Sequence, residues 1–284
     1  MEKRPINIKN SENIDQIEKT ANYEGNHSEL LFSRMEDSKI KNQIIDLIHF
    51  EEIERINSGE STRPKINENG EFIRNNHEEI IFEEINEPES KEHIEKQFEK
   101  NLKSAQHKTY FDYENESPNS ETMHLGFIMT WNNKKISEKE LNIIEAHEKG
   151  HLIRRYVGSY FDNYFQQCLN IDKIEYPNYF NKEKIIENIK QSPEYDDIEL
   201  NDETLKEIFL DRLFNALEIA ERMGQLKNYF GMSGEEYFTK EHLDYAKAHY
   251  IEDTGVDNLM GIMFNAITPE KEDKFLEIIN SAGI

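Results

Sequence analysis

The sequence predicts an α+β protein that is mainly α-helical. A small β element precedes a helical core, and an acidic, partly disordered N-terminal arm comes before both. Segments with apolar residues at helical spacing and recognisable end signals fill most of the chain beyond residue 107. One apolar run, HLGFIMTW at 124–131, is typical of a buried strand, and the NNKK after it is typical of a turn. We therefore divide the chain into an arm, residues 1–105, and a folded domain, residues 106–284.

The N-terminal arm is rich in acidic and other polar residues. Residues 1–27 show no sustained hydrophobic period, which is typical of disorder. Residues 28–56 repeat apolar side chains at helical spacing, and residues 89–105 are compatible with a charged helix. Because this third of the chain offers little apolar material to bury, we expect a solvated, partly helical tail. The functional alternative is a regulatory arm that binds a partner.

The folded domain contains helices whose ends are marked in the sequence. The clearest covers residues 136–158, where Ser137 and Glu140 form a capping box and a glycine ends the helix. A Tyr/Phe-rich stretch at 159–169 predicts another helix, and the polar, proline-containing residues 176–202 are typical of an inserted loop. Three later helices begin at capping residues. Asp202 starts a predicted helix that runs to about Tyr229, Thr239 starts the next one, and Thr268 followed by Pro269 starts the last.

Composition and charge exclude several classes of partner and location. With 36% hydrophobic and 32% charged residues and a formal net charge of −24, the chain should repel nucleic acid and anionic lipid surfaces. We therefore expect neither a nucleic-acid nor a membrane partner. The N-terminal sequence lacks the apolar core of a signal peptide, and no window approaches the ~18 apolar residues that a membrane span needs. We expect a cytoplasmic location, and the sequence leaves the oligomeric state open.

The single cysteine, Cys168, limits the available chemistry. One cysteine excludes an intrachain disulfide and any zinc site built on cysteines. Its surroundings, FQQCLN on a predicted helix, favour a buried apolar side chain over a catalytic nucleophile.

Two histidines within EAHEKGHLIRRY (145–156) have the spacing of a metal site. Residues four apart on a helix lie about 40° apart round its axis, so His147 and His151 point the same way. Their imidazoles can therefore bind one tetrahedral Zn²⁺. Glu148 is offset by about 100°, which places its carboxylate beside the open coordination position, where it can take a proton from a metal-bound water.

This five-residue segment, His147-Glu148-Lys149-Gly150-His151, resembles the active-site helix of the zincin metallopeptidases. The predicted strand before it and the helices after it resemble that architecture more loosely, over about 107–230. The resemblance implies that His147 and His151 are zinc ligands and that Glu148 is the general base for hydrolysis of a peptide or protein substrate. No further histidine follows at the spacing of the metzincins. The similarity is therefore to the zincins whose third ligand is a glutamate on a later helix, the gluzincins.

The predicted helix at 202–229 offers the candidates for that third ligand. Small residues recur four apart at Ala216, Ala220 and Gly224, giving a face that another helix can approach closely. On a helical wheel, Glu218 and Glu221 both flank the apolar face, and Glu221 is the more inward.

The alternatives for these glutamates stay open. Glu218 can instead form a surface pair with Arg222, four residues on. Glu207 is a weaker candidate, although Glu207 and Asp211 have a spacing that resembles the ligand-plus-support pair of the thermolysin-like group. We predict Glu218 or Glu221 as the ligand.

Two later histidines are candidates for stabilising the oxyanion of the reaction. His242 and His249 are seven apart on one predicted helix and so share a face. Either could donate a hydrogen bond to a tetrahedral intermediate or replace the glutamate as third ligand. The alternative is that both pack against acidic neighbours such as Asp253. Aromatic side chains in residues 156–165 could line substrate pockets, although core packing is expected for most of them.

Two functions therefore follow from the sequence. The first is a zinc-dependent peptidase in which the metal polarises a water and Glu148 deprotonates it, then protonates the leaving amine. The alternative is a non-catalytic helical protein that interacts or regulates through its acidic N-terminal arm, with zinc absent or structural. A zincin-like regulator that cleaves a single protein partner lies between the two.

Overall fold

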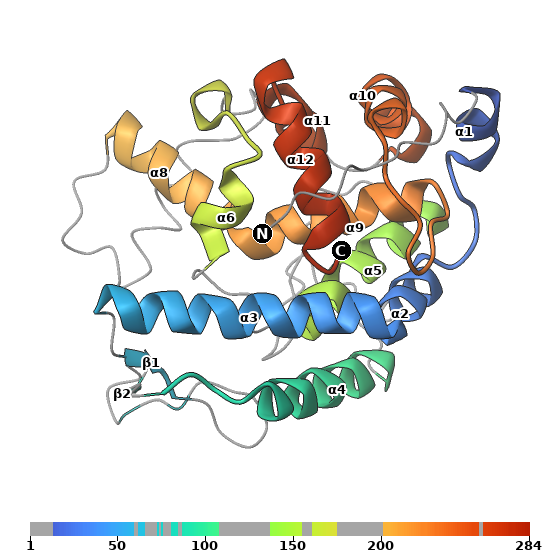
Figure 1. The fold of residues 1–284 in the computed structure, drawn as a ribbon. Helices are drawn as coiled ribbons and strands as arrows, with labels where there is room; N and C mark the ends of the chain where they lie inside the picture. Colours follow the sequence, from blue (N-terminus) through green and yellow to red (C-terminus); the bar gives the residue numbers. More distant parts are fainter. Residues whose placement is uncertain are drawn as a thin grey trace, which may run out of the picture.

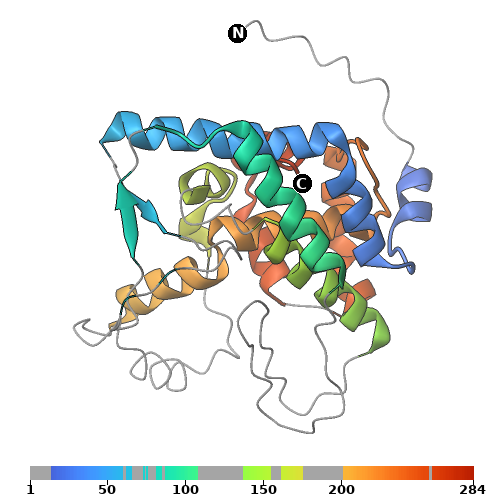
Figure 2. The same ribbon diagram turned by 90° about the horizontal axis from the view of Figure 1, so that it is seen from below.

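The structure is a computed structural model of the 284-residue chain. It describes residues 14–59, 62–65, 73, 75, 81–84, 87–107, 137–154, 161–174, 201–255 and 258–284. Figures 1 and 2 show an assembly of helices with one small hairpin at its edge.

Helices make up most of the described chain. In order they are α1 (Ile14–Thr20), α2 (His27–Glu36), α3 (Ser38–Ser58), α4 (Lys91–His107), α5 (Glu138–Ile153), α6 (Asp162–Gln166), the 3₁₀ turn η2 (Ile171–Lys173), α8 (Asp202–Leu213), α9 (Ala216–Tyr229), α10 (Lys240–Thr254), α11 (Asn258–Ala266) and α12 (Pro269–Ser281). Two strands, β1 (Thr62–Pro64) and β2 (Phe82–Glu84), pair antiparallel with Thr62 opposite Glu84. The mainly helical class with a small β element is confirmed.

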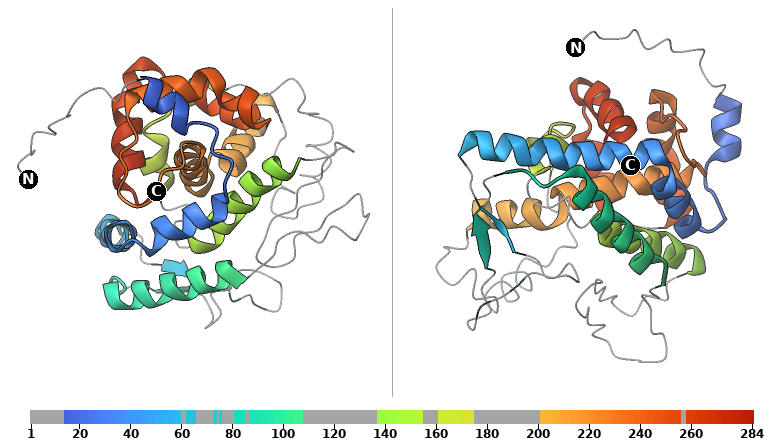
Figure 3. Two further views of the ribbon diagram at one scale, coloured as in Figure 1. Left: turned by 90° about the vertical axis from the view of Figure 1, so that its right-hand side faces the viewer. Right: turned by 60° about the horizontal axis from the view of Figure 1, so that its bottom comes forward.

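Helix α9 lies at the centre of the fold. Helices α2, α5, α6 and α12 all contact it, and nearly every residue of α9 is buried. Figure 3 shows the C-terminal helices and α6 on one side of α9 and α2 and α5 on the other. The long helix α3 and helix α4 then lie side by side beneath this group (Figure 1), and α4 also contacts α5. A residue on α9 can therefore meet side chains from both halves of the chain.

The helices of the N-terminal arm differ from the solvated tail expected from the sequence. Their apolar side chains belong to the same core cluster as those of the C-terminal helices. The reason is visible in α4, where the apolar residues form one narrow stripe, Ile94, Phe98, Leu102 and Ala105, and all four are buried. A low average hydropathy conceals a stripe that is sufficient to hold the helix against its neighbours.

Two predicted helices are each broken into two by a short polar residue. The helix expected over residues 28–56 breaks at Asp37, whose Oδ1 accepts the backbone N–H groups of Lys39 and Ile40 at the start of α3. The long helix expected from Asp202 breaks before α9, where the Asn215 side chain accepts the N–H of Glu218. Such side chains bind the backbone locally and start a new helix.

Other sequence predictions about the elements were confirmed or lie outside the described residues. The capping box of Ser137 and Glu140 begins α5, Thr239 precedes α10, and Thr268 with Pro269 begins α12. The short helix α6 lies within the predicted helix at 159–169, and α11 was not predicted. The strand expected at 124–131 and most of the loop expected at 176–202 fall outside the described residues. Among the residues described, no helix combines the length and apolarity that crossing a membrane requires.

A buried lysine of α9 makes a testable contribution to stability. Lys227 is almost fully buried, and its Nζ donates to the carbonyl oxygen of Ile284 at 2.9 Å. Burial, together with the charges of Arg34 and Arg154, lowers the pKa of Lys227 to about 7. The folded protein therefore releases this proton above about pH 7, whereas an unfolded lysine keeps it to its ordinary pKa of 10.5.

We expect the free energy of unfolding to rise with pH between about 7 and 10, because the unfolded state binds more protons there. The slope from Lys227 alone should be at most about 1.4 kcal/mol per pH unit. Urea denaturation at pH 7, 8 and 9 measures it. The slope should become smaller in K227M and stay unchanged in K274M, which removes a partly exposed lysine of α12. Equal slopes in K227M and the unmodified chain would contradict the assignment.

Candidate metal centre

Helices α5 and α9 meet at Gly150, the small residue of the histidine motif. A methyl group added at Gly150 would lie 1.7 Å from Oε2 of Glu221, so only glycine leaves room for this carboxylate. Glu221 in turn accepts a hydrogen bond from Arg154 of the α5 C-cap, with 2.5 Å between Nη1 and Oε1, and both side chains are buried. A close helix contact and a buried ion pair thus fix how α9 lies on α5.

One turn away, the same contact brings His147, His151 and Glu218 together. The Nε2 atoms of the two histidines lie 2.9 Å apart. Glu218 places Oε2 3.5 Å from Nε2 of His147 and Oε1 3.3 Å from Nε2 of His151. These three residues form a possible metal-binding group, with one ligand atom from each within 4.8 Å of the others.

The spacing of these atoms fits a tetrahedral metal ion. Zinc bonds to nitrogen and oxygen are about 2.0–2.2 Å long, so two ligand atoms on one tetrahedral zinc lie about 3.3–3.5 Å apart. The distances from His147 to Oε2 and from His151 to Oε1 of Glu218 fall in this range, each histidine facing a different oxygen. The separation of the histidine nitrogens is shorter, so the two rings must move slightly apart to hold an ion. Two imidazoles and a carboxylate form a donor set that suits zinc.

The surroundings of Glu218 keep it ionised. Its side chain is 14% exposed and lies against Arg222, which donates to its carboxylate from an almost buried position. Although burial raises the pKa of Glu218, the charge of Arg222 and the hydrogen bonds of the two histidines hold it well below its usual range. The predicted pair with Arg222 is therefore present, but it lies beside the histidines rather than on the surface.

Glu148 lies in α5 directly after His147 and is itself buried. Burial raises its pKa, the charges of the two histidines oppose that shift, and the nearby charge of Glu218 adds to it. Within the part of the chain that the structure describes, Oε2 of Glu148 has no hydrogen-bond partner. A buried carboxylate oxygen of raised basicity beside a possible metal group is suited to accept a proton from a bound water.

The structure gives the other predicted ligands different surroundings. Glu221 pairs with Arg154 and is not part of the metal-binding group. Glu207 is exposed on α8, a helix separate from α9, and it is not part of the metal-binding group. Which glutamate faces the histidines depends on the rotation of α9 about its own axis relative to α5. A helical wheel for one continuous helix over residues 202–229 does not contain that information.

His242 and His249 lie on α10 outside the metal-binding group. His242 completes the capping box of Thr239, whose N–H donates to its Nδ1 at 3.1 Å, and it packs against Phe230 and Phe238. Burial lowers its pKa to about 4. His249 is exposed and stacks on Tyr245, with 4.4 Å between ring centroids. The position of His242 three residues after Thr239 is a signal in the sequence for this capping role.

Cys168 and the aromatic stretch belong to the core. Cys168 is buried, its Sγ donates to the carbonyl of Phe165, and burial raises the pKa of the thiol to about 12. These facts agree with the predicted apolar role. Phe161 and Phe165 are also buried in the core, whereas residues 155–160 lie outside the described part.

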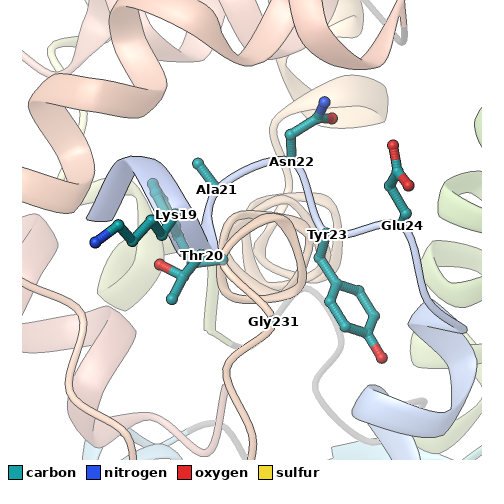
Figure 4. Close-up of a pocket in the computed structure, with 8 residues that line it drawn as sticks. Lys19, Thr20, Ala21, Asn22, Tyr23, Glu24 and Gly231 are labelled. Atoms are coloured by element: carbon teal, nitrogen blue, oxygen red, sulfur yellow. The ribbon is translucent and has the colours of Figure 1, made fainter. Parts of the chain in front are cut away.

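A pocket of about 530 Å³ lies away from this group, where the α1–α2 linker passes the turn after α9. Figure 4 shows its wall formed by Lys19 to Glu24 on one side and Gly231 on the other. None of the residues that line it belongs to the possible metal-binding group.

Comparison with known proteins finds no family model, no curated protein and no solved structure that matches this chain. Fold and site together define a mainly helical protein with a possible metal-binding group of two histidines and one glutamate.

Gly150→Ala is expected to destabilise the protein by at least ~1–3 kcal/mol, because the new methyl group would overlap the Glu221 carboxylate in a closed interface. Gly224→Ala in α9 is the matched control. Its methyl group would meet Arg34 and Glu221 only at 3.9 Å, and alanine favours the helix by up to ~1 kcal/mol. Guanidinium denaturation compares the two, and equal stability of the variants would argue against the close contact.

Glu218→Gln and Glu221→Gln should separate a metal ligand from a structural ion pair. E218Q should weaken zinc binding by more than the roughly 10–100-fold that is typical of a lost outer-shell contact. E221Q should bind zinc more tightly than E218Q but lose stability on the order of 3 kcal/mol, because Arg154 stays buried without its anion. Zinc titration and denaturation measure both effects. Zinc lost in E221Q but retained in E218Q would reverse the assignment.

Proposed function

We propose that this protein is a zinc-dependent peptidase. The observation that carries the proposal is the convergence of His147 and His151 from α5 and Glu218 from α9, with the buried carboxylate of Glu148 on the same helix turn. The described residues supply three ligands rather than four. Three protein ligands are typical of a catalytic zinc site, in which one position stays open for water or substrate, whereas structural sites are closed by four.

His147, His151 and Glu218 would hold the zinc ion, which would supply Lewis-acid polarisation of a water molecule and of a peptide carbonyl group. Glu148 accepts the proton of the attacking water, and its raised pKa makes it a better base than an exposed glutamate. It then gives this proton to the nitrogen of the leaving amine. Glu218, held ionised by Arg222, supplies the negative charge that a divalent cation needs beside two neutral imidazoles.

The alternative function is a non-catalytic helical protein that acts through its N-terminal arm. Helices α2, α3 and α4 pack into the common core, so these parts of the arm are occupied with holding the fold. This packing favours the peptidase over the interaction arm.

The deciding experiment measures metal content and hydrolysis together. Protein purified without chelator is expected to contain about one zinc per chain and to cleave a mixed peptide library. Glu148→Gln should retain the zinc and lose roughly 10²–10⁴-fold in hydrolysis rate, the usual contribution of a general base. A fully folded protein that never binds zinc would contradict the proposal and support the interaction protein. Zinc bound with no cleavage by the unmodified chain would leave a metal site and reject the peptidase.

A further inference from the structure

Arg222 lies four residues after Glu218 in α9 and is fixed by several contacts. Its guanidinium donates to the Glu218 carboxylate at Oε2 and to the Glu218 carbonyl at 3.1 Å. It also lies over the ring of Phe214, with 5.6 Å to the ring centroid. Only 3% of the Arg222 side chain is exposed. The guanidinium is therefore held in one place, and it holds one oxygen of Glu218 with it.

Both oxygens of Glu218 face a histidine, and Arg222 contacts Oε2. Oε2 accepts from Arg222 and lies 3.5 Å from Nε2 of His147, whereas Oε1 lies 3.3 Å from Nε2 of His151. A carboxylate without such a partner can bind a metal through both oxygens, which occupies a second coordination position. We propose that Arg222 is a positioning residue that makes Glu218 a one-oxygen ligand of the metal ion. This inference rests on the proposed function, because it requires that the group binds a metal.

The charge of Arg222 argues for geometry as the reason for its presence. A guanidinium beside a metal ligand repels a divalent cation, so its charge alone lowers the affinity for zinc. Its planar N–H groups, however, fix a carboxylate more firmly than an ammonium does. The Glu218–Arg222 ion pair therefore lowers the metal affinity unless the gain from a fixed Glu218 carboxylate is larger than the loss from repulsion. A ligand restricted to one oxygen leaves the open position that a hydrolytic zinc site needs.

Cobalt(II) and X-ray absorption test this on the unmodified chain. The cobalt-loaded protein should show the intense visible bands of four-coordinate cobalt, and zinc absorption fine structure should fit one carboxylate oxygen. If the loaded protein instead shows a two-oxygen carboxylate, the role of Arg222 is rejected. If it binds neither metal, the proposed function itself fails, so the two failures are distinguishable.

Two substitutions then separate orientation from charge. Arg222→Lys keeps the charge but loses the fixed guanidinium with its bonds to Oε2 and to the Glu218 carbonyl, and it should weaken zinc binding roughly 10–100-fold and weaken the cobalt bands. Arg222→Met removes the charge as well, so the bands should change while the loss of affinity is smaller. The control is Lys96→Met, which breaks an exposed ion pair with the same spacing, Glu92–Lys96. The inference would be overturned if both Arg222 variants had the same cobalt spectra and zinc affinities as the control.

Discussion

The buried contact between Glu221, Gly150 and Arg154 determines the rest of the site. Removing one partner of a buried ion pair typically costs about 3–5 kcal/mol, so α9 cannot slide or rotate on α5 without a large loss. Arg34 of α2 strengthens the arrangement, because it donates to the carbonyl oxygens of Met232 at 2.9 Å and Gly224 at 3.4 Å. Glu218 lies one turn before Glu221 and therefore has little freedom to face anything other than the two histidines.

Basic side chains gather in the interior of this acidic protein. The chain carries a net charge of −24, yet four basic side chains are buried around α9, namely Arg34, Arg154, Arg222 and Lys227. Two of them pair with the glutamates of α9, at Glu218–Arg222 and Glu221–Arg154. A net charge of −24 gives the chain a field that attracts cations, divalent metal ions among them.

The sequence predicted what depends on neighbouring residues and missed what depends on distant ones. The α5 capping box and the shared direction of His147 and His151 follow from helical geometry alone, and both are present. The choice between Glu218 and Glu221 required the relation of two helices far apart in the chain. It also required knowledge of the helix break at Asn215, because the apolar residues before the break do not define the buried face of α9. The packing of α4 was missed because overall composition, rather than the position of its apolar stripe, was used to judge it.

The shared core also connects the site to the described helices of the N-terminal arm. Helices α2 and α4 both contact α5, and Arg34 reaches across to the end of α9. A fragment that begins at residue 106 would open the apolar faces of α5 and α9 to water and leave Glu221 and Arg154 partly solvated. The possible metal-binding group and helices α2 and α4 are thus held by one hydrophobic core.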